Sequence, residues 1–490
     1  MTAKSPLSPA TKCESAASAR TMAPQEQKGK RLPAITPEAR RYAVRELARR
    51  AGVSKEFFEQ WGIATSLEHT KVFFDAGRNA WVRFVHEKRE LNDEMASGSL
   101  PVARAGWGEA LWDSATGYDL CLPFCSPEPD SHAPLYQRSN GGVTCRMDLL
   151  ASILFTLSRV EETLCPARDE HGRFPASASL ASGHDFLERP ILDEHGLAFQ
   201  QVLRSLLPSW QPEPRKLKLK LTHDIDNVGI PFQIRTSLGH CLKRRRPAAT
   251  LRDFLSLFTS SLPAELDLVC KLADISAARG LASAFFWKGS PQGLRDSGYD
   301  PIHEKVQQVI ADLRERGFEL GVHPGYETYG DRGKLAGEVE KLRQALRVNA
   351  PGGRQHYLRW SPETWADWEA CGLAYDSSLG FAERFGFRAG TGFPYRPWSF
   401  RENRELRLME VPLILMDCTP VKYMSLPRRE ALDRIEALVR RMKRTGGVFT
   451  MLWHNTPLMD PCYDGWYEPI LDLLSGTENF SVPSSAEELW

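Results

Sequence analysis

From about residue 216 onward, short apolar strands alternate with amphipathic helices, and this alternation restricts the fold more than any other feature of the chain. In the first strand, KLKLKL, apolar residues recur at every second position, whereas in the helical stretches they recur at spacings of three and four. Repeated strand and helix units form parallel sheets or barrels whose chemistry lies at the carboxyl ends of the strands. The predicted fold class is therefore α/β, with strands at 216–224, 282–287, 318–323, 356–360, 408–414 and 447–454, and helices at 302–316, 333–347, 361–371 and 428–444.

The 490 residues exceed one ordinary hydrophobic core, so we expect more than one domain. Residues 1–30 are rich in Ser, Ala, Lys and Pro and are predicted to be a disordered tail. Residues 31–210 are predicted to form a smaller α+β N-terminal domain with a helical pair at 37–61, and residues 211–490 the barrel domain.

The charge balance of 63 Lys plus Arg against 62 Asp plus Glu gives no reason to expect a nucleic-acid or membrane partner. The helical pair has a helix-turn-helix outline, but its second helix carries Glu56 and Glu59, which would repel phosphates. No apolar run approaches the roughly 18 to 20 residues of a membrane span, and no signal peptide is recognisable, so we expect a cytoplasmic protein. The oligomeric state cannot be read from the sequence.

Two carboxylates, Asp224 and Asp226, end the first strand in the segment LTHDID. Asn227 and Gly229 follow and break the strand pattern, so both acids lie at a strand-to-loop junction. Two like charges held close together cannot both ionise freely, so one binds a cation or shares a proton.

Other polar residues also stand at predicted strand ends. His323 ends FELGVH, and His454 ends GVFTMLWH. With Asp224 and Asp226 they form a mixed oxygen and nitrogen donor set that suits a borderline divalent metal, with zinc favoured. Two further residues have predicted orienting roles: Arg354 would stabilise a charged carboxylate, and Asp376 would hold the imidazole of His454.

The order and spacing of LTHDID, GVHPGY, RQHY, YDSS and LWH resemble the five motifs of polysaccharide deacetylases, the NodB-homology or carbohydrate esterase family 4 proteins, over about residues 216–460. LSRVEET and GRFPASAS are similar to segments of bacterial deacetylase-like proteins with an extra N-terminal domain. The resemblance implies a distorted (β/α) barrel with fewer than eight units. It also implies a metal-dependent hydrolase that cleaves an amide C–N bond and removes an acyl group, preferably acetyl, from an N-acylated amino sugar or glycan precursor.

The resemblance further assigns a role to each motif residue. It implies that Asp224 is the general base, that Asp226 and His323 are metal ligands, and that Arg354 positions the base. It also implies that the backbone amide of Tyr357 stabilises the oxyanion, and that His454 is the general acid, held by Asp376.

The chain departs from the family pattern at both metal-binding motifs. Ile225 separates two acids that are adjacent in the family, which leaves the division of roles between Asp224 and Asp226 open. Glu327 stands where the family has a second histidine, so the third ligand is Glu327, His356 or a water.

Two other functions remain open on the sequence. One is a catalytically inactive protein of the deacetylase fold that binds a glycan, because fold alone does not determine function. The other is a DNA-binding regulator whose barrel senses a sugar. The expected partner is a carbohydrate or amino-sugar substrate, and Trp360, Trp365 and Trp398 are candidates for stacking on it, although core packing is favoured for all three.

Overall fold

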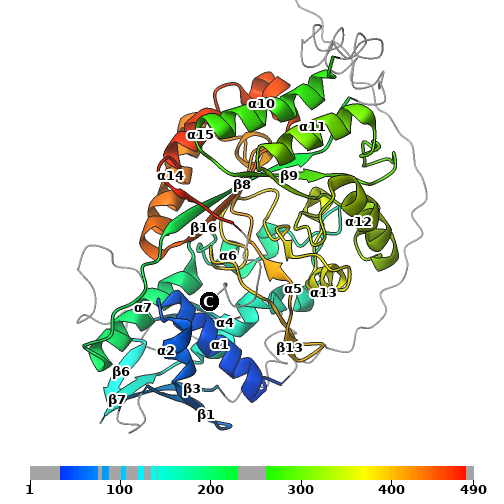
Figure 1. Ribbon diagram of the computed structural model, residues 1–490. Coiled ribbons are helices and arrows are strands. Elements are labelled where there is room, and N and C mark those ends of the chain that lie inside the picture. Colours follow the sequence, from blue (N-terminus) through cyan, green and yellow to red (C-terminus); the bar gives the residue numbers. More distant parts are fainter. Residues whose placement is uncertain are drawn as a thin grey trace, which may run out of the picture.

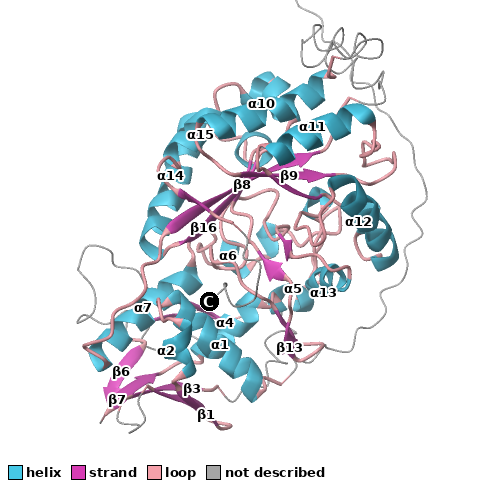
Figure 2. Cartoon of the chain, viewed as in Figure 1, coloured by secondary structure: helices cyan, strands magenta, loops and turns pink. Residues whose placement is uncertain are grey.

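The computed structural model of the chain describes residues 34–74, 80–87, 101–105, 120–125, 134–139, 141–229 and 261–481. These residues form a mixed α/β structure in which a parallel sheet with outer helices lies beside a smaller sheet and its helices (Figures 1 and 2). The predicted tail at 1–30 lies outside the described residues.

The larger part of the structure comprises β8 and all described residues that follow it in the chain. Its centre is a parallel sheet with the strand order β10-β9-β8-β16-β15. Its longest strand, β8, lies in the middle and is almost wholly buried, as expected for a parallel strand covered on both faces. β17 pairs with the first half of β8, and β9 pairs with its second half. The strands are β8 (Leu217–Ile225), β9 (Ser283–Trp287), β10 (Glu319–Val322), β15 (Leu415–Met416), β16 (Gly447–Leu452) and β17 (Glu478–Asn479).

Helices cover the outside of this sheet, and the predicted helices are confirmed with small shifts of their ends (Figure 1). α11 and α12 pack on β10, while α14 packs on β8 and β16. The helices are α10 (Ala264–Ala278), α11 (Glu304–Glu315), α12 (Arg332–Leu346), α13 (Pro362–Ala370), α14 (Arg428–Thr445) and α15 (Tyr467–Leu473).

Beyond β10 the parallel pairing is reduced to isolated β-bridges. Gly353 forms one such bridge with Val322 and another with Asp376. A Cβ at Gly353 would lie 1.9 Å from the carbonyl oxygen of Val322, so only glycine allows this approach. The bridges lead to the short parallel pair β11 (Tyr375–Asp376) and β14 (Met409–Glu410). The predicted parallel α/β arrangement is thus confirmed, but the described strands do not form a complete regular barrel.

One predicted strand is wrong. Residues 356–360 contain the 3₁₀ turn His356–Leu358, in which Tyr357 and Leu358 have φ angles of +61° and +53°. Left-handed residues cannot continue a strand, so the backbone turns here in spite of its apolar side chains. The predicted strand at 408–414 is reduced to β14, followed by β15.

The smaller part has a five-stranded sheet with the order β1-β2-β3-β7-β6, antiparallel except between β3 and β7. The β4–β5 hairpin lies apart from this sheet. The strands are β1 (Gly62–Thr65), β2 (His69–Phe73), β3 (Trp81–Val85), β4 (Val102–Ala105), β5 (Leu120–Pro123), β6 (Tyr136–Ser139) and β7 (Gly142–Cys145).

The predicted helical pair is present as α1 (Pro37–Arg50) and the short α2 (Lys55–Glu59). α1 is largely buried and packs against α4 and α7. The apolar stretch 147–163 forms two helices and not one, because Arg159 adopts a left-handed conformation and bonds the carboxylate of Glu162. The other helices here are α4 (Leu149–Leu157), α5 (Val160–Leu164), α6 (Leu180–Gly183) and α7 (Ile191–Leu206).

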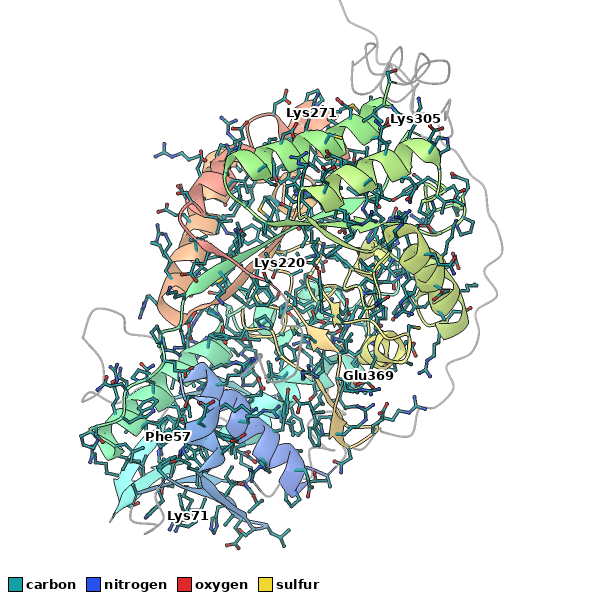
Figure 3. All side chains as sticks on the ribbon, viewed as in Figure 1. Phe57, Lys71, Lys220, Lys271, Lys305 and Glu369 are labelled. Carbon is teal, nitrogen blue, oxygen red and sulfur yellow. The ribbon has the colours of Figure 1, made fainter. Side chains whose placement is uncertain are left out.

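Buried apolar side chains form one cluster that runs through both parts, from Ala39 in α1 to Leu471 in α15. Side chains fill the interior of both parts (Figure 3). A buried ion pair also links them, since Arg388 donates to both carboxylate oxygens of Glu162 at 2.9 and 2.6 Å. Among the described residues, no helix combines the length and the apolar character that a membrane span requires.

Candidate active site

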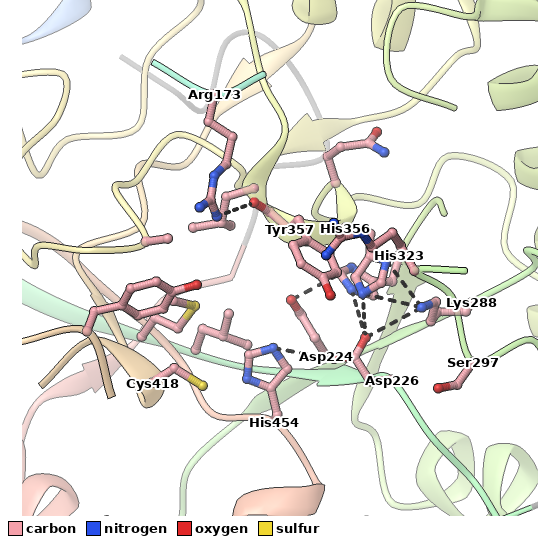
Figure 4. Close-up of a pocket in the computed structure, with 17 residues that line it drawn as sticks. Arg173, Asp224, Asp226, Lys288, Ser297, His323, His356, Tyr357, Cys418 and His454 are labelled. Atoms are coloured by element: carbon pink, nitrogen blue, oxygen red, sulfur yellow. Dashed lines mark hydrogen bonds and ion pairs between the residues drawn. The ribbon is translucent and has the colours of Figure 1, made fainter. Parts of the chain in front are cut away.

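The carboxyl ends of the parallel strands surround a cavity of about 320 Å³ (Figure 4). Parallel strands end at the same edge of a sheet, so residues far apart in the sequence meet there. The ionisable side chains from the strand ends that line the cavity are Asp224, Asp226, Lys288, His323 and His454, joined by His356 from the loop after Gly353.

A carboxylate and two imidazoles meet on one side of this cavity. The Nε2 atoms of His323 and His356 lie 3.3 and 3.2 Å from Oδ1 of Asp226, and one ligand atom from each residue lies within 4.8 Å of the others. Among the described residues, Oδ1 of Asp226 and Nε2 of His323 have no hydrogen-bond partner, although both are buried. Two imidazole nitrogens and one carboxylate oxygen are a common donor set for zinc. These three residues therefore fit a divalent metal.

Outer groups fix the orientation of both histidines. Nδ1 of His323 donates to the carbonyl oxygen of Arg354 at 2.7 Å, and Nδ1 of His356 lies 2.7 Å from Oδ1 of Asp296. Metal-binding histidines usually donate their second N–H to a carbonyl or a carboxylate in this way. Both contacts leave the Nε2 atoms facing Asp226, on the side where a metal could bind.

A buried cation lies beside the same cluster. Nζ of Lys288 is 2.8 Å from Oδ1 of Asp296 and 3.7 Å from Oδ1 of Asp226. Burial by itself would raise the pKa of Asp226, but His356 and Lys288 outweigh it and hold the pKa well below its ordinary value. Asp226 is therefore a carboxylate at neutral pH.

The other acid of LTHDID has different surroundings. Nη1 of the fully buried Arg354 donates to Oδ1 of Asp224 at 2.8 Å and to Oγ1 of Thr222 at 3.0 Å. Arg354 is itself held by Ser377, whose carbonyl and hydroxyl oxygens accept from Nε and Nη2. The nearest charged partner of Asp224 is thus Arg354, with His323 farther away at 3.7 Å, whereas Asp226 lies closest to His323 and His356.

His454 lies two residues after β16 and contacts Asp417, not Asp376 as predicted. Nδ1 of His454 lies 3.0 Å from Oδ1 of Asp417, and Oδ2 of Asp417 accepts the backbone N–H of His454 at 2.7 Å. Burial would lower the pKa of His454, but the Asp417 carboxylate outweighs it and raises the pKa to about 9. Nε2 of His454 faces the cavity, 3.7 Å from Oδ2 of Asp226.

The predicted role of Asp376 is wrong because of strand order. Asp417 follows β15, which pairs with β16, whereas Asp376 lies on β11, which pairs with β14. The carboxylate of Asp376 accepts instead from the backbone N–H and the hydroxyl of Ser378, at 2.8 and 2.5 Å.

Glu327 is not placed to bind a metal. It is exposed in the 3₁₀ turn Tyr326–Thr328 and does not line the cavity. Backbone N–H groups of Gly325 and Tyr326 donate to Glu338 and Asp296, and these bonds fix a turn that carries residue 327 outward. Of the three proposed alternatives for the third ligand, His356 is the residue that the structure brings to the cluster.

The three tryptophans considered for sugar stacking are buried in the hydrophobic core, and none of them lines the cavity: Trp360, Trp365 and Trp398. Tyr357 does line it, and its backbone is left-handed.

Asp417, Cys418 and His454 form a second group with possible ligand atoms close together. Burial raises the pKa of the Cys418 thiol, whose sulfur accepts from the hydroxyl of Tyr463 at 3.2 Å. A neutral thiol is a poor metal ligand, because the thiolate is the binding form. The contacts of this group are explained by the orientation of His454.

Four residues of the cavity region were missed by the sequence reasoning. Lys288 directly follows the predicted strand at 282–287, and Asp417 follows the predicted strand at 408–414, so strand-end position is a signal that would have found both. Asp296 lies in a loop without periodicity, and Arg173 in a segment punctuated by Gly and Pro that resembles an ordinary connection. No local pattern marks these two.

Comparison with known families gives one match. Residues 34–208 match a family of unknown function, DUF7033. No protein of curated function matches the chain.

Several solved structures share a distant likeness with this chain. A protein from Mycobacterium smegmatis assigned as a polysaccharide deacetylase has 16% identity and a TM-score of 0.38, over 57% of this chain and 91% of its own. A protein from Bordetella bronchiseptica assigned as a polysaccharide deacetylase involved in O-antigen biosynthesis has 15% identity and a TM-score of 0.28, over 50% and 74%. The polysaccharide deacetylase Bc1974 from Bacillus cereus has 10% identity and a TM-score of 0.29, over 56% and 95%.

Proposed function

We propose that this protein is a metal-dependent hydrolase that removes an acyl group, acetyl in the first instance, from an N-acylated amino sugar or glycan precursor. The observation that carries the proposal is that the two acids at the end of β8 have different nearest partners. Asp226 lies with His323 and His356, whereas Asp224 is paired with Arg354. Two carboxylates with different surroundings can take different roles, one as a ligand and one as a base. The order of the deacetylase-like motifs in the sequence supports the same assignment.

In the proposed mechanism, Asp226, His323 and His356 would hold the metal, and zinc is the favoured ion. A bound divalent metal would polarise the acyl carbonyl and lower the pKa of water, which provides a nucleophile at neutral pH. Asp224 accepts the proton of the attacking water, and Arg354 keeps this base charged and oriented.

Two groups complete the proposed reaction. The backbone N–H of Tyr357 donates to the acyl oxygen as negative charge builds on it. His454 then donates a proton to the departing amine, and Asp417 holds its ring in place. With a pKa raised to about 9, His454 carries the proton that this role requires at neutral pH.

The shape of the cavity supports a small acyl group. Beside the polar cluster, part of the wall is apolar and is formed by Leu358, Ala382, Met416 and Leu452. A short apolar wall next to a few polar groups suits the methyl of an acetyl group. On the expectation of a cytoplasmic protein, we propose a soluble or lipid-linked precursor as the substrate, in preference to an extracellular polymer.

The test is acetate release from N-acetylated amino sugars by purified protein of known metal content. We expect release that chelators abolish and zinc restores, and that Asp224→Asn and His454→Ala reduce by at least about 100-fold. Asp300→Asn, at an exposed carboxylate outside the cavity, is the matched control and should behave like the wild type. Zinc-loaded protein that releases no acetate from any such sugar, or variants as active as the wild type, would refute the proposal.

A further inference from the structure

The segment before α6 carries a preorganised arginine. Oδ1 of Asp169 accepts the backbone N–H groups of His171 and Arg173, each at 2.9 Å, and Oδ2 accepts Nε of Arg173 at 2.7 Å. Only 8% of Arg173 is exposed, and it lines the cavity. Its guanidinium is therefore fixed in direction before any substrate binds.

This arginine reaches the backbone of the site. Nη1 of Arg173 donates to the carbonyl oxygen of Tyr357 at 3.0 Å (Figure 4). The two segments are also joined in the opposite direction, since Nε of Arg359 donates to the carbonyl oxygen of His171 at 2.8 Å. The rings of His171 and Tyr357 lie 4.7 Å apart between centroids. Arg173, which lies within the segment that matches DUF7033, thus contributes to the lining of the cavity.

The hydrogen bond from Arg173 is made to a strained part of the backbone, at Tyr357. Tyr357 and the following Leu358 have φ angles of +61° and +53°. For residues other than glycine, such conformations are unfavourable and persist only where the surroundings impose them. On one side of Tyr357, the backbone N–H of His356 donates to the carbonyl oxygen of Pro324. On the other side, Arg173 binds the carbonyl oxygen, so both ends of the left-handed residue are held.

We infer that Arg173 is a positioning residue of the proposed active site, which holds the Tyr357 backbone in the conformation that presents its N–H to the acyl oxygen. The inference rests on the proposed function, because the N–H of Tyr357 matters there as an oxyanion donor. It also assigns a role to the N-terminal part of the chain, which supplies Arg173 to the site.

The test compares Arg173→Met and Arg173→Lys with the wild type and with Glu170→Gln, a control at an exposed acid of the same turn. Loss of one oxyanion donor typically lowers kcat by 10² to 10³. For Arg173→Met we expect a fall of about this size, with KM within about threefold and zinc affinity unchanged. Guanidinium ion in the buffer should restore part of the kcat of Arg173→Met. The kcat of Arg173→Lys should lie between those of Arg173→Met and the wild type. Unchanged kcat, or a loss of zinc that accounts for the fall, would overturn the inference.

Hydrogen exchange gives a readout that does not depend on activity. In Arg173→Met the backbone amides of residues 356–360 should exchange at least about tenfold faster, while those of 221–225 in β8 should keep their wild-type rates. Unchanged exchange at 356–360 would overturn the inference even in an active enzyme. If the wild type releases no acetate while exchange behaves as expected, the proposed function fails and the positioning role stands.

Discussion

The substitution Asp296→Asn tests the role of the carboxylate that orients His356, the proposed third metal ligand. Oδ1 of Asp296 lies 2.7 Å from Nδ1 of His356 and 2.8 Å from Nζ of Lys288, and Oδ2 accepts the backbone N–H of Tyr326 at 2.9 Å. Asparagine has nearly the same shape and keeps one oxygen for the Tyr326 N–H. The substitution therefore removes a charge next to the metal cluster while the turn is preserved.

Two effects determine the expected size of the change. Loss of a carboxylate behind a metal-binding histidine costs about 10- to 100-fold in metal affinity, which corresponds to about 1.4 to 2.7 kcal/mol. In addition, Lys288 loses its nearest carboxylate and is left with Asp226, 3.7 Å away. At an effective dielectric constant of about 20, this attraction is about 4 kcal/mol before desolvation, so Lys288 competes with the metal for Asp226. We expect zinc affinity to fall by about 100-fold.

The assay is competition for zinc between the protein and a fluorescent chelator at fixed pH. Asp300→Asn, at an exposed carboxylate in the same connection between β9 and α11, should keep wild-type affinity. Adding Lys288→Met to Asp296→Asn should recover about tenfold, because the competing cation is then absent. If Asp296→Asn binds zinc within about threefold of the wild type, Asp296 does not support the ligand His356 and the reasoning is wrong.

Three further predictions concern other buried groups. Asp417→Asn should lower kcat about 100-fold at unchanged zinc content because His454 loses its orienting carboxylate; an unchanged rate would assign that role to another group. Burial lowers the pKa of His195 from 6.5 to about 4, so the unfolded chain binds more protons and stability is lost as pH falls from 6.5 to 4. In urea titrations, His195→Gln should reduce the slope of the unfolding free energy against pH by up to about 1.4 kcal/mol per pH unit. An unchanged slope would contradict this role of His195. Glu162→Gln leaves buried Arg388 without its anion and should cost about 3 to 5 kcal/mol in unfolding free energy, whereas a loss below about 1 kcal/mol would show that the pair is not needed.

The longer strands of the parallel sheet could be predicted because each is a buried apolar run bounded by breaks. Strands of two residues, such as Leu415–Met416, are too short to show any period. The turn at Tyr357 and Leu358 could not be predicted either, because their side chains are typical of strands and the left-handed backbone is imposed by contacts from residues distant in the sequence.

Part of the site could be predicted for the same reason. Asp224, His323 and His454 each stand at the end of an apolar run, and parallel strands bring such ends together. The partner of His454 depended instead on which strand lies beside β16, and strand order is a property of the whole sheet. Asp376 and Asp417 look alike in local sequence, and only the pairing of β15 with β16 distinguishes them.

The shared core has a consequence for how the chain unfolds. Separable domains melt in independent steps, but here one apolar cluster spans both parts, and Arg434 and Arg441 of α14 bond Glu188, in the segment just before α7. We expect a single cooperative transition in calorimetry, with equal van't Hoff and calorimetric enthalpies. Residues 211–490 expressed alone would expose the apolar surface that α1, α4 and α7 now help to cover. The smallest folding unit of this protein is then larger than the segment that carries its deacetylase-like motifs.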